Sequence, residues 1–137
     1  MRDLNKIILH CSATQEGKDY SVETIRGWHL KRGWRDIGYH YVIRLNGDIE
    51  AGRPLEQIGA HTQGQNTGSI GICYIGGITA DGKPKDTLTA KQENALVNLI
   101  ADLRKLYGPL TLHGHNEYSS KACPSFKVPE KFPRLLK

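Results

Sequence analysis

Residues 6–11 are Lys6-Ile7-Ile8-Leu9-His10-Cys11, a short apolar run that ends in two side chains able to bind a metal. The β-branched isoleucines predict a β-strand, and the polar residues from Ser12 onward end it. Side chains alternate along a strand, so His10 shares a face with Ile8 while Cys11 shares the other face with Leu9. We therefore expect Cys11 to point away from any site that His10 lines.

Further strands are expected along the chain. Tyr39 to Leu45 is rich in aromatic and β-branched residues, and Asn46-Gly47 is a strong hairpin signal that returns the chain through Asp48 to Ala51. Apolar runs at residues 69–75 and 110–114 predict two more strands.

Two helices are expected between these strands. Ser21 can cap the first, which carries Val22, Ile25 and Trp28 at helical spacing. In the second, Thr89 and Gln92 form a capping box and Gly108-Pro109 ends the helix. Its apolar stripe consists of Ala95, Leu96, Leu99, Ile100, Leu103 and Leu106.

The mixture of strands and helices predicts an α/β fold, a single domain with a central mixed β-sheet flanked by helices. A length of 137 residues suits one domain, 1–137. The short C-terminal tail, which begins at Lys121 and holds Pro124, Pro129 and Pro133, is expected to be mostly irregular.

Composition narrows the function classes. Hydrophobic residues make up 38% and charged residues 24%, as in ordinary globular proteins. No apolar run reaches the ~18 residues of a membrane span or the length of a secretory signal, so we expect a cytoplasmic protein as synthesised that makes no membrane contact. The net charge of +5 suits an anionic polymer, but its scattered lysines and arginines do not favour nucleic acid. We also expect a monomer.

Zinc in a hydrolase needs three protein ligands and one open position. His115 and Cys123 lie eight residues apart, a spacing that lets a loop bring both side chains to one ion. His10, at the end of the first strand, is the leading third ligand. His29, His40, His61 and His113 remain competitors, and spacing alone does not exclude His113, which shares a strand with His115. Three cysteines are a poor disulfide framework, so Cys11 and Cys73 are expected to be free thiols.

Six segments, in order along the chain, resemble those of the type 2 N-acetylmuramoyl-L-alanine amidases. They are Ile7 to Thr14, Asp36 to Tyr41, Asn46 to Arg53, Gly59-Ala60-His61, Asn66 to Cys73 and Lys121 to Phe126. The resemblance covers about residues 6–126. Phage lysozymes of the T-seven type, which are amidases, are the most similar branch, and animal peptidoglycan recognition proteins are more distant.

The resemblance implies a Zn²⁺ site at His10, His115 and Cys123, with Tyr39 and Lys121 as catalytic residues. It also implies that His61, Asn66 and Ser69 lie on the substrate side. The substrate would be bacterial peptidoglycan, cut at the amide between N-acetylmuramic acid and L-alanine. A zinc-bound water, its pKa lowered from ~15.7 towards ~7, would attack the carbonyl, and Tyr39 and Lys121 would stabilise the oxyanion.

The chain departs from the family pattern at one position. Phage relatives often carry a second histidine where Asn116 stands, which removes no ligand. Glu50 and Glu117 receive no catalytic role.

Relatives that bind peptidoglycan without cutting it typically lack the cysteine ligand, whereas Cys123 is present. A phage lysozyme of this type also inhibits RNA polymerase, but this sequence identifies no residues for that role.

Overall fold

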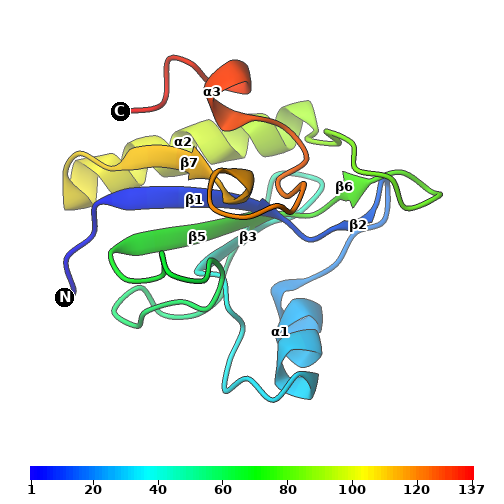
Figure 1. Ribbon diagram of the computed structural model, residues 1–137, viewed down its shortest axis with the longest axis horizontal. Coiled ribbons are helices and arrows are strands. Elements are labelled where there is room, and N and C mark those ends of the chain that lie inside the picture. Colours follow the sequence, from blue (N-terminus) through cyan, green and yellow to red (C-terminus); the bar gives the residue numbers. More distant parts are fainter.

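Strand β1 (Lys6–Cys11) lies inside a five-stranded sheet in the computed structural model, which describes residues 1–137. The strand order is β4-β3-β5-β1-β7 (Figure 1). The other members of the sheet are β3 (Tyr41–Ile43), β4 (Ile49–Ala51), β5 (Ser69–Tyr74) and β7 (Thr111–Gly114). β3, β5, β1 and β7 run parallel and β4 is antiparallel to β3, so the predicted mixed sheet is confirmed.

The register of the sheet decides which side chains are neighbours. His10 lies beside Cys73, and Ile8 lies between Gly71 and His113. Partners in a parallel ladder point to the same face, so these residues share the face of the sheet opposite that of Ile7 and Leu9. The carboxyl ends of β1 and β7 meet at one edge, which places the residues that follow them close together.

Helix α2 (Ala90–Tyr107) covers the face that carries Ile7 and Leu9. The predicted capping box of Thr89 and Gln92 is confirmed, and the buried Gln92 side chain also donates to the carbonyls of Ile43 and Ile75. The predicted inward position of Leu106 is wrong, since this side chain is 71% exposed. Four residues beyond Leu103, the helical repeat reaches Tyr107, which packs against the core instead.

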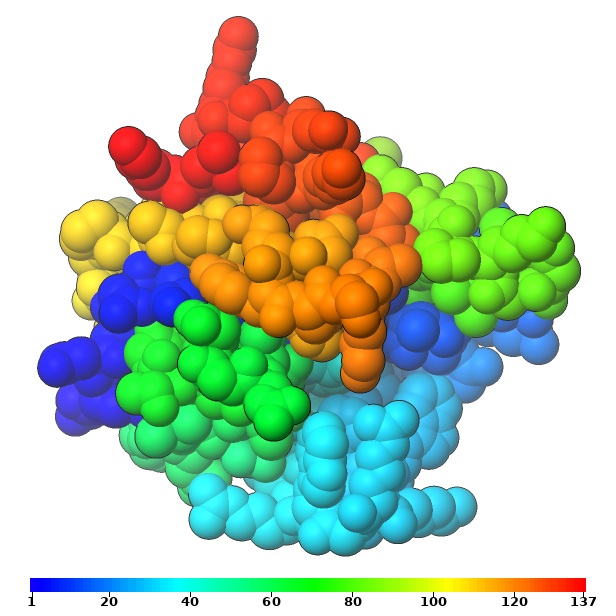
Figure 2. All heavy atoms as spheres, in the orientation of Figure 1, coloured from blue at the N-terminus to red at the C-terminus, as the bar shows by residue number.

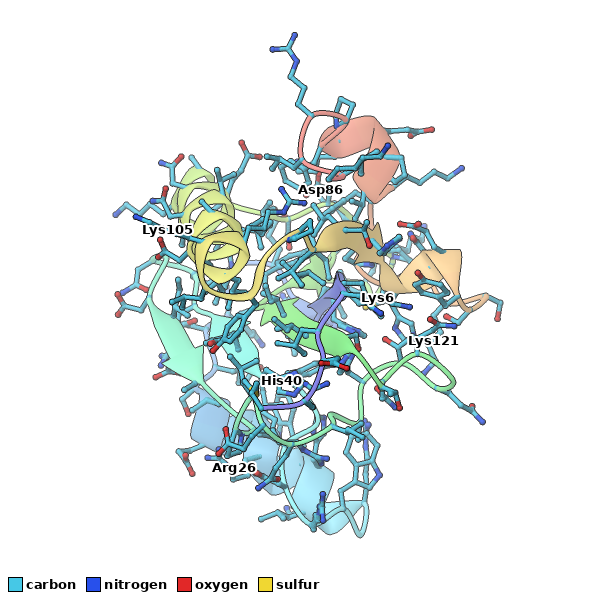
Figure 3. All side chains as sticks on the ribbon, turned by 90° about the vertical axis from the view of Figure 1, so that its left-hand side faces the viewer. Lys6, Arg26, His40, Asp86, Lys105 and Lys121 are labelled. Atoms are coloured by element: carbon cyan, nitrogen blue, oxygen red, sulfur yellow. The ribbon has the colours of Figure 1, made fainter.

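Helix α1 (Val22–Lys31) packs on a second, smaller core with Ile37, Val42 and Ile75. Its predicted cap is confirmed, because the Ser21 hydroxyl accepts from the amide of Thr24. A Glu50 carboxylate oxygen accepts from the Val22 amide at 2.8 Å, so this carboxylate holds the first turn of the helix. Figure 3 shows Lys105 of α2 and Lys121 on opposite sides of the sheet.

Several short elements differ from the expectation. A two-stranded ladder joins β2 (Thr14–Gln15) to β6 (Gly77–Ile78), and neither strand was predicted. The strand expected from Tyr39 to Leu45 is β3, and it begins at Tyr41 rather than Tyr39. The tail forms a helix, α3 (Val128–Lys131), because Pro129 stands in its first turn, where no amide donor is needed. No helix combines the length and the apolar character that a bilayer crossing requires.

Candidate functional site

Three potential metal ligands converge at the carboxyl edge of the sheet. The donor atoms of His10, His115 and Cys123 all lie within 4.8 Å of one another. Nδ1 of His10 is 3.7 Å from Sγ of Cys123, and the ring centroids of His10 and His115 are 4.7 Å apart. A tetrahedral zinc ion with bonds of about 2.1 Å to nitrogen and 2.3 Å to sulfur separates these donors by about 3.6 Å. The observed spacing fits such an ion.

The fold brings these ligands together from three segments. His10 is the penultimate residue of β1, and His115 opens the 3-10 turn η1 (His115–Glu117) directly after the neighbouring strand β7. The loop of Cys123 is attached to the sheet, because the Tyr74 hydroxyl donates to the Pro124 carbonyl at 2.6 Å. The Ser125 hydroxyl also donates to the Gly77 carbonyl at 2.8 Å. The loop is therefore fixed to β5 and β6, and β5 pairs directly with β1, the strand that carries His10.

Both histidines of this cluster are neutral at neutral pH. Burial, with His61 and His115 nearby, holds the pKa of His10 well below its usual value. Burial and the charge of Lys121 lower the pKa of His115. A neutral imidazole is the form that binds a metal.

The structure separates His115 from its competitors. His113, on β7, lies between the Thr111 hydroxyl at 2.8 Å and a Glu117 carboxylate oxygen at 3.2 Å, and it takes no part in the cluster. His29 and His40 instead accept backbone amide hydrogens, from Gly38 and Gly71 respectively. The 3-10 turn after β7 redirects the chain, so of His113 and His115 only His115 faces His10. Asn116 binds the Phe126 carbonyl at 3.0 Å and supports the same turn.

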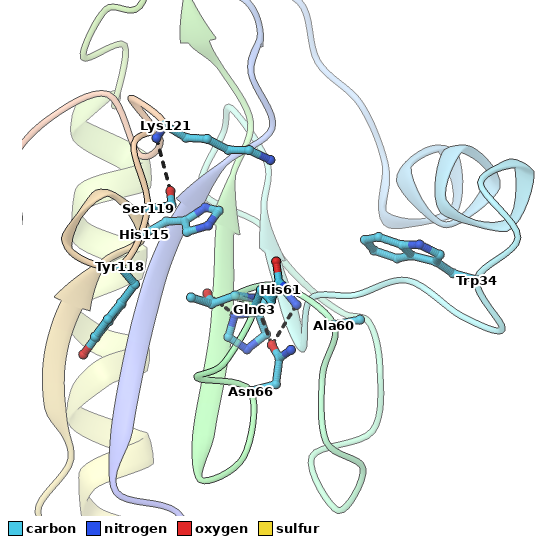
Figure 4. A pocket seen from close by; sticks show the side chains of 10 residues that line it. Trp34, Ala60, His61, Gln63, Asn66, His115, Tyr118, Ser119 and Lys121 are labelled. Atoms are coloured by element: carbon cyan, nitrogen blue, oxygen red, sulfur yellow. Dashed lines mark hydrogen bonds between the residues drawn. The ribbon is translucent and has the colours of Figure 1, made fainter.

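A pocket of about 520 Å³ opens beside the cluster (Figure 4). Segments near residues 34, 60–66 and 115–121 surround it, and Figure 2 shows these cyan, green and orange segments around a hollow on one face. The lining residues are Trp34, Ala60, His61, Thr62, Gln63, Asn66, His115, Tyr118, Ser119 and Lys121. Trp34 and Tyr118 were not singled out from the sequence, because an isolated aromatic residue in a loop carries no pattern.

Lys121 and Tyr39 both lie near the cluster, but only Lys121 lines the pocket. The exposed Lys121 lines the pocket, and its charge contributes to the low pKa values of His10 and His115. Tyr39 does not line the pocket, and its ring packs 5.1 Å from that of His10. Burial and the neighbouring thiols raise the pKa of the Tyr39 hydroxyl well above its usual value, so it remains a hydrogen-bond donor.

The three residues expected on the substrate side lie at different depths. His61 and Asn66 line the pocket. Ser69 is fully buried beneath His61, so the expectation that it faces substrate does not match its position at the start of β5. Thr62, which the sequence did not single out, lies 3.2 Å from Nε2 of His10.

Cys11 borders the site through its backbone, although its side chain faces the core. Its side chain belongs to the core under α2 and its thiol hydrogen-bonds with the Ser125 hydroxyl at 3.8 Å, whereas its amide lies 3.2 Å from Sγ of Cys123. The prediction that the Cys11 side chain points to the face opposite His10 is confirmed, and Cys11 borders the site through its amide because Cys123 approaches the end of β1. All three cysteines are free thiols.

Comparisons with known proteins agree on one family. The sequence model of the N-acetylmuramoyl-L-alanine amidases matches residues 1–126. The endolysin of Klebsiella phage KP32 is 42% identical over 127 residues, which are 93% of this chain and 84% of the endolysin.

Two solved structures share the fold. The amidase LysC of Clostridium intestinale superposes with a TM-score of 0.79 at 27% identity, over 95% of this chain and 82% of that one. The ectodomain complex of peptidoglycan recognition proteins LCa and LCx, solved with bound tracheal cytotoxin, also gives a TM-score of 0.79 at 27% identity, over 97% of this chain and 84% of that one.

Proposed function

Because the chain belongs to the N-acetylmuramoyl-L-alanine amidase family, we propose that it hydrolyses peptidoglycan with a zinc ion held by His10, His115 and Cys123. The bond cut is the amide between N-acetylmuramic acid and L-alanine. The observation that carries this proposal is the convergence of two neutral imidazoles and a thiol within 4.8 Å, beside an open pocket. Two nitrogen ligands and one sulfur ligand form a donor set that suits zinc and leaves a fourth position for water.

When bound, zinc lowers the pKa of a coordinated water to about 7 and polarises the substrate carbonyl. The chain's own residues supply the remaining chemistry. The Lys121 ammonium is proposed to stabilise the negative charge that develops on the carbonyl oxygen as the water attacks. Tyr39, which keeps its proton at neutral pH, is proposed to donate a hydrogen bond to the same oxygen.

The pocket is proposed to hold the sugar and the first residues of the stem peptide. Trp34 and Tyr118 line it, and aromatic side chains supply apolar surface for the faces of sugar rings. His61 and Asn66 are proposed to line the substrate side of this groove. Burial of Ser69 favours a supporting role for that residue instead.

Mass spectrometry of purified bacterial cell wall incubated with the protein tests the proposed function. We expect release of intact stem peptides that carry a free L-alanine amine, with the glycan strands left uncut. A Cys123→Ser variant is the matched control and should release none. Binding to the wall without release of peptides, or release of sugar fragments, would overturn the proposal.

A further inference from the structure

The ring of His10 makes polar contacts through both of its nitrogens. Nδ1 faces Sγ of Cys123 at 3.7 Å. Nε2 lies 2.9 Å from Nδ1 of His61 and 3.2 Å from the Thr62 hydroxyl. A neutral imidazole carries one proton, and only the nitrogen without that proton can bind a metal. The neighbours of Nε2 therefore decide whether Nδ1 is free.

Ser69, His61 and His10 form a hydrogen-bonded chain, and the bonds of the Ser69 hydroxyl fix the direction of the others. The Ser69 hydroxyl donates its single proton to the Asn66 carbonyl at 3.1 Å, because a carbonyl only accepts. The same hydroxyl lies 3.2 Å from Nε2 of His61, so in that bond it must accept. His61 consequently carries its proton on Nε2, and its Nδ1 is an acceptor. His10 then donates from Nε2, which leaves the lone pair of Nδ1 directed at Cys123.

The position of the His61 ring is tightly constrained. A Cβ atom at Gly71 would lie 2.5 Å from Cδ2 of His61, and one at Gly59 would lie 2.7 Å from the same atom. The backbone amides of His61 and Thr62 both donate to the Asn66 side-chain oxygen at 2.9 Å. Two glycines and one amide side chain thus hold the ring where its Nδ1 meets His10.

We propose that His61 is a positioning residue that, with Ser69, keeps the proton of His10 on Nε2 and so presents Nδ1 to the metal. This inference rests on the zinc site of the proposed function, although it does not depend on what the enzyme cuts. Groups that hydrogen-bond to the second ring nitrogen of a metal-binding histidine typically contribute about 10–100-fold to metal affinity. His61 also borders the pocket, but the contact that matters here is the one with His10.

Two substitutions of similar shape separate this role from a merely structural one. In His61→Asn the side-chain oxygen occupies the place of Nδ1 and can still accept from His10, whereas His61→Leu removes this acceptor and leaves only the Thr62 hydroxyl at 3.2 Å. Competition with a chromophoric chelator should show zinc affinity about 10–100-fold weaker for His61→Leu and within about threefold of wild type for His61→Asn. Gln63 is an exposed residue of the pocket that does not contact His10, so Gln63→Leu is the control and should keep the zinc affinity of wild type. Equal affinities for the Leu and Asn variants would overturn the proposal.

A direct measurement on the zinc-loaded wild-type protein avoids any effect of substitution on folding. Long-range ¹H–¹⁵N correlation spectra of the histidine rings should show zinc on Nδ1 of His10 and a proton on its Nε2. Zinc on Nε2, or His61 protonated on Nδ1, would refute the assignment. A protein that passes this test and yet releases no stem peptides would contradict the proposed function alone.

Discussion

The backbone amide of Cys11 donates a hydrogen bond to Sγ of Cys123, with 3.2 Å between nitrogen and sulfur and a sequence separation of 112. An amide hydrogen directed at a sulfur stabilises its thiolate form, which is the form that binds zinc. The contact joins the end of β1 to the loop that carries the third ligand. Because His10 precedes Cys11, one strand end both supplies a ligand and supports another.

The first prediction concerns the metal. Purified protein should carry about one zinc ion per chain, and Cys123→Ser should lose most of it, because a serine hydroxyl is a much weaker zinc ligand than a thiolate. Elemental analysis after dialysis measures this loss. His113→Ala is the control and should retain zinc, since His113 binds Thr111 and Glu117 instead. Retention of zinc by the Cys123 variant would show that the ligand set is wrong.

The second prediction concerns Lys121. Lys121→Ala should keep its zinc and its fold while turnover falls at least tenfold. Loss of an oxyanion-stabilising donor typically costs about 2.7–4 kcal/mol, or a factor of about 100–1,000. Substrate binding should change much less, because the negative charge develops only in the transition state.

Steady-state kinetics on a soluble muramyl peptide would separate turnover from binding for this variant. Lys127→Ala, an exposed lysine outside the pocket, is the matched control. Normal turnover combined with weaker binding would make Lys121 a wall-binding charge.

The third prediction concerns the two other cysteines. A Cys11→Ser and Cys73→Ser double variant should retain most of its activity, because neither thiol belongs to the ligand cluster. Both side chains are buried, so we expect a loss of stability of about 1–3 kcal/mol. Urea unfolding and wall-lysis assays measure the two effects separately. A folded double variant without any activity would mean that one of these thiols takes part in catalysis.

The fourth prediction concerns stability at acid pH. Burial, together with the charges of Arg2 and Arg53, lowers the pKa of His40 from about 6.5 to about 4, and Nδ1 of His40 accepts from the Gly71 amide. Below pH 6.5 the unfolded chain therefore binds more protons than the folded one, so stability falls as the pH falls towards 4. Between pH 8 and pH 5 this single histidine should cost about 2 kcal/mol.

His40→Asn keeps an acceptor near the Gly71 amide but does not titrate in this range. Urea unfolding at pH 8 and pH 5 should show a smaller loss of stability for this variant than for wild type. His29, whose pKa is also lowered to about 4, remains in the variant, so part of the acid sensitivity should persist. An unchanged difference between the two pH values would exclude His40 as a contributor.

Features that depend on neighbouring residues in the chain could be predicted from the sequence by itself. The alternation of residues 6–11, the Asn46-Gly47 turn and the capping box of Thr89 and Gln92 are set by local backbone geometry, and each lies in the element expected of it. The convergence of His10, His115 and Cys123 was anticipated from strand ends and loop spacing, and then from the family resemblance.

Only the tertiary structure decided which of the remaining polar residues belong to the site. Whether His113 or His115 faces His10 depends on the 3-10 turn that follows β7, and Ser69 is buried because the His61 ring covers it. Cys11 borders the site because a loop from the other end of the chain meets the end of its strand. The alternation rule describes one strand, whereas these outcomes depend on how distant segments pack against it, and residue spacing carries no information about that packing.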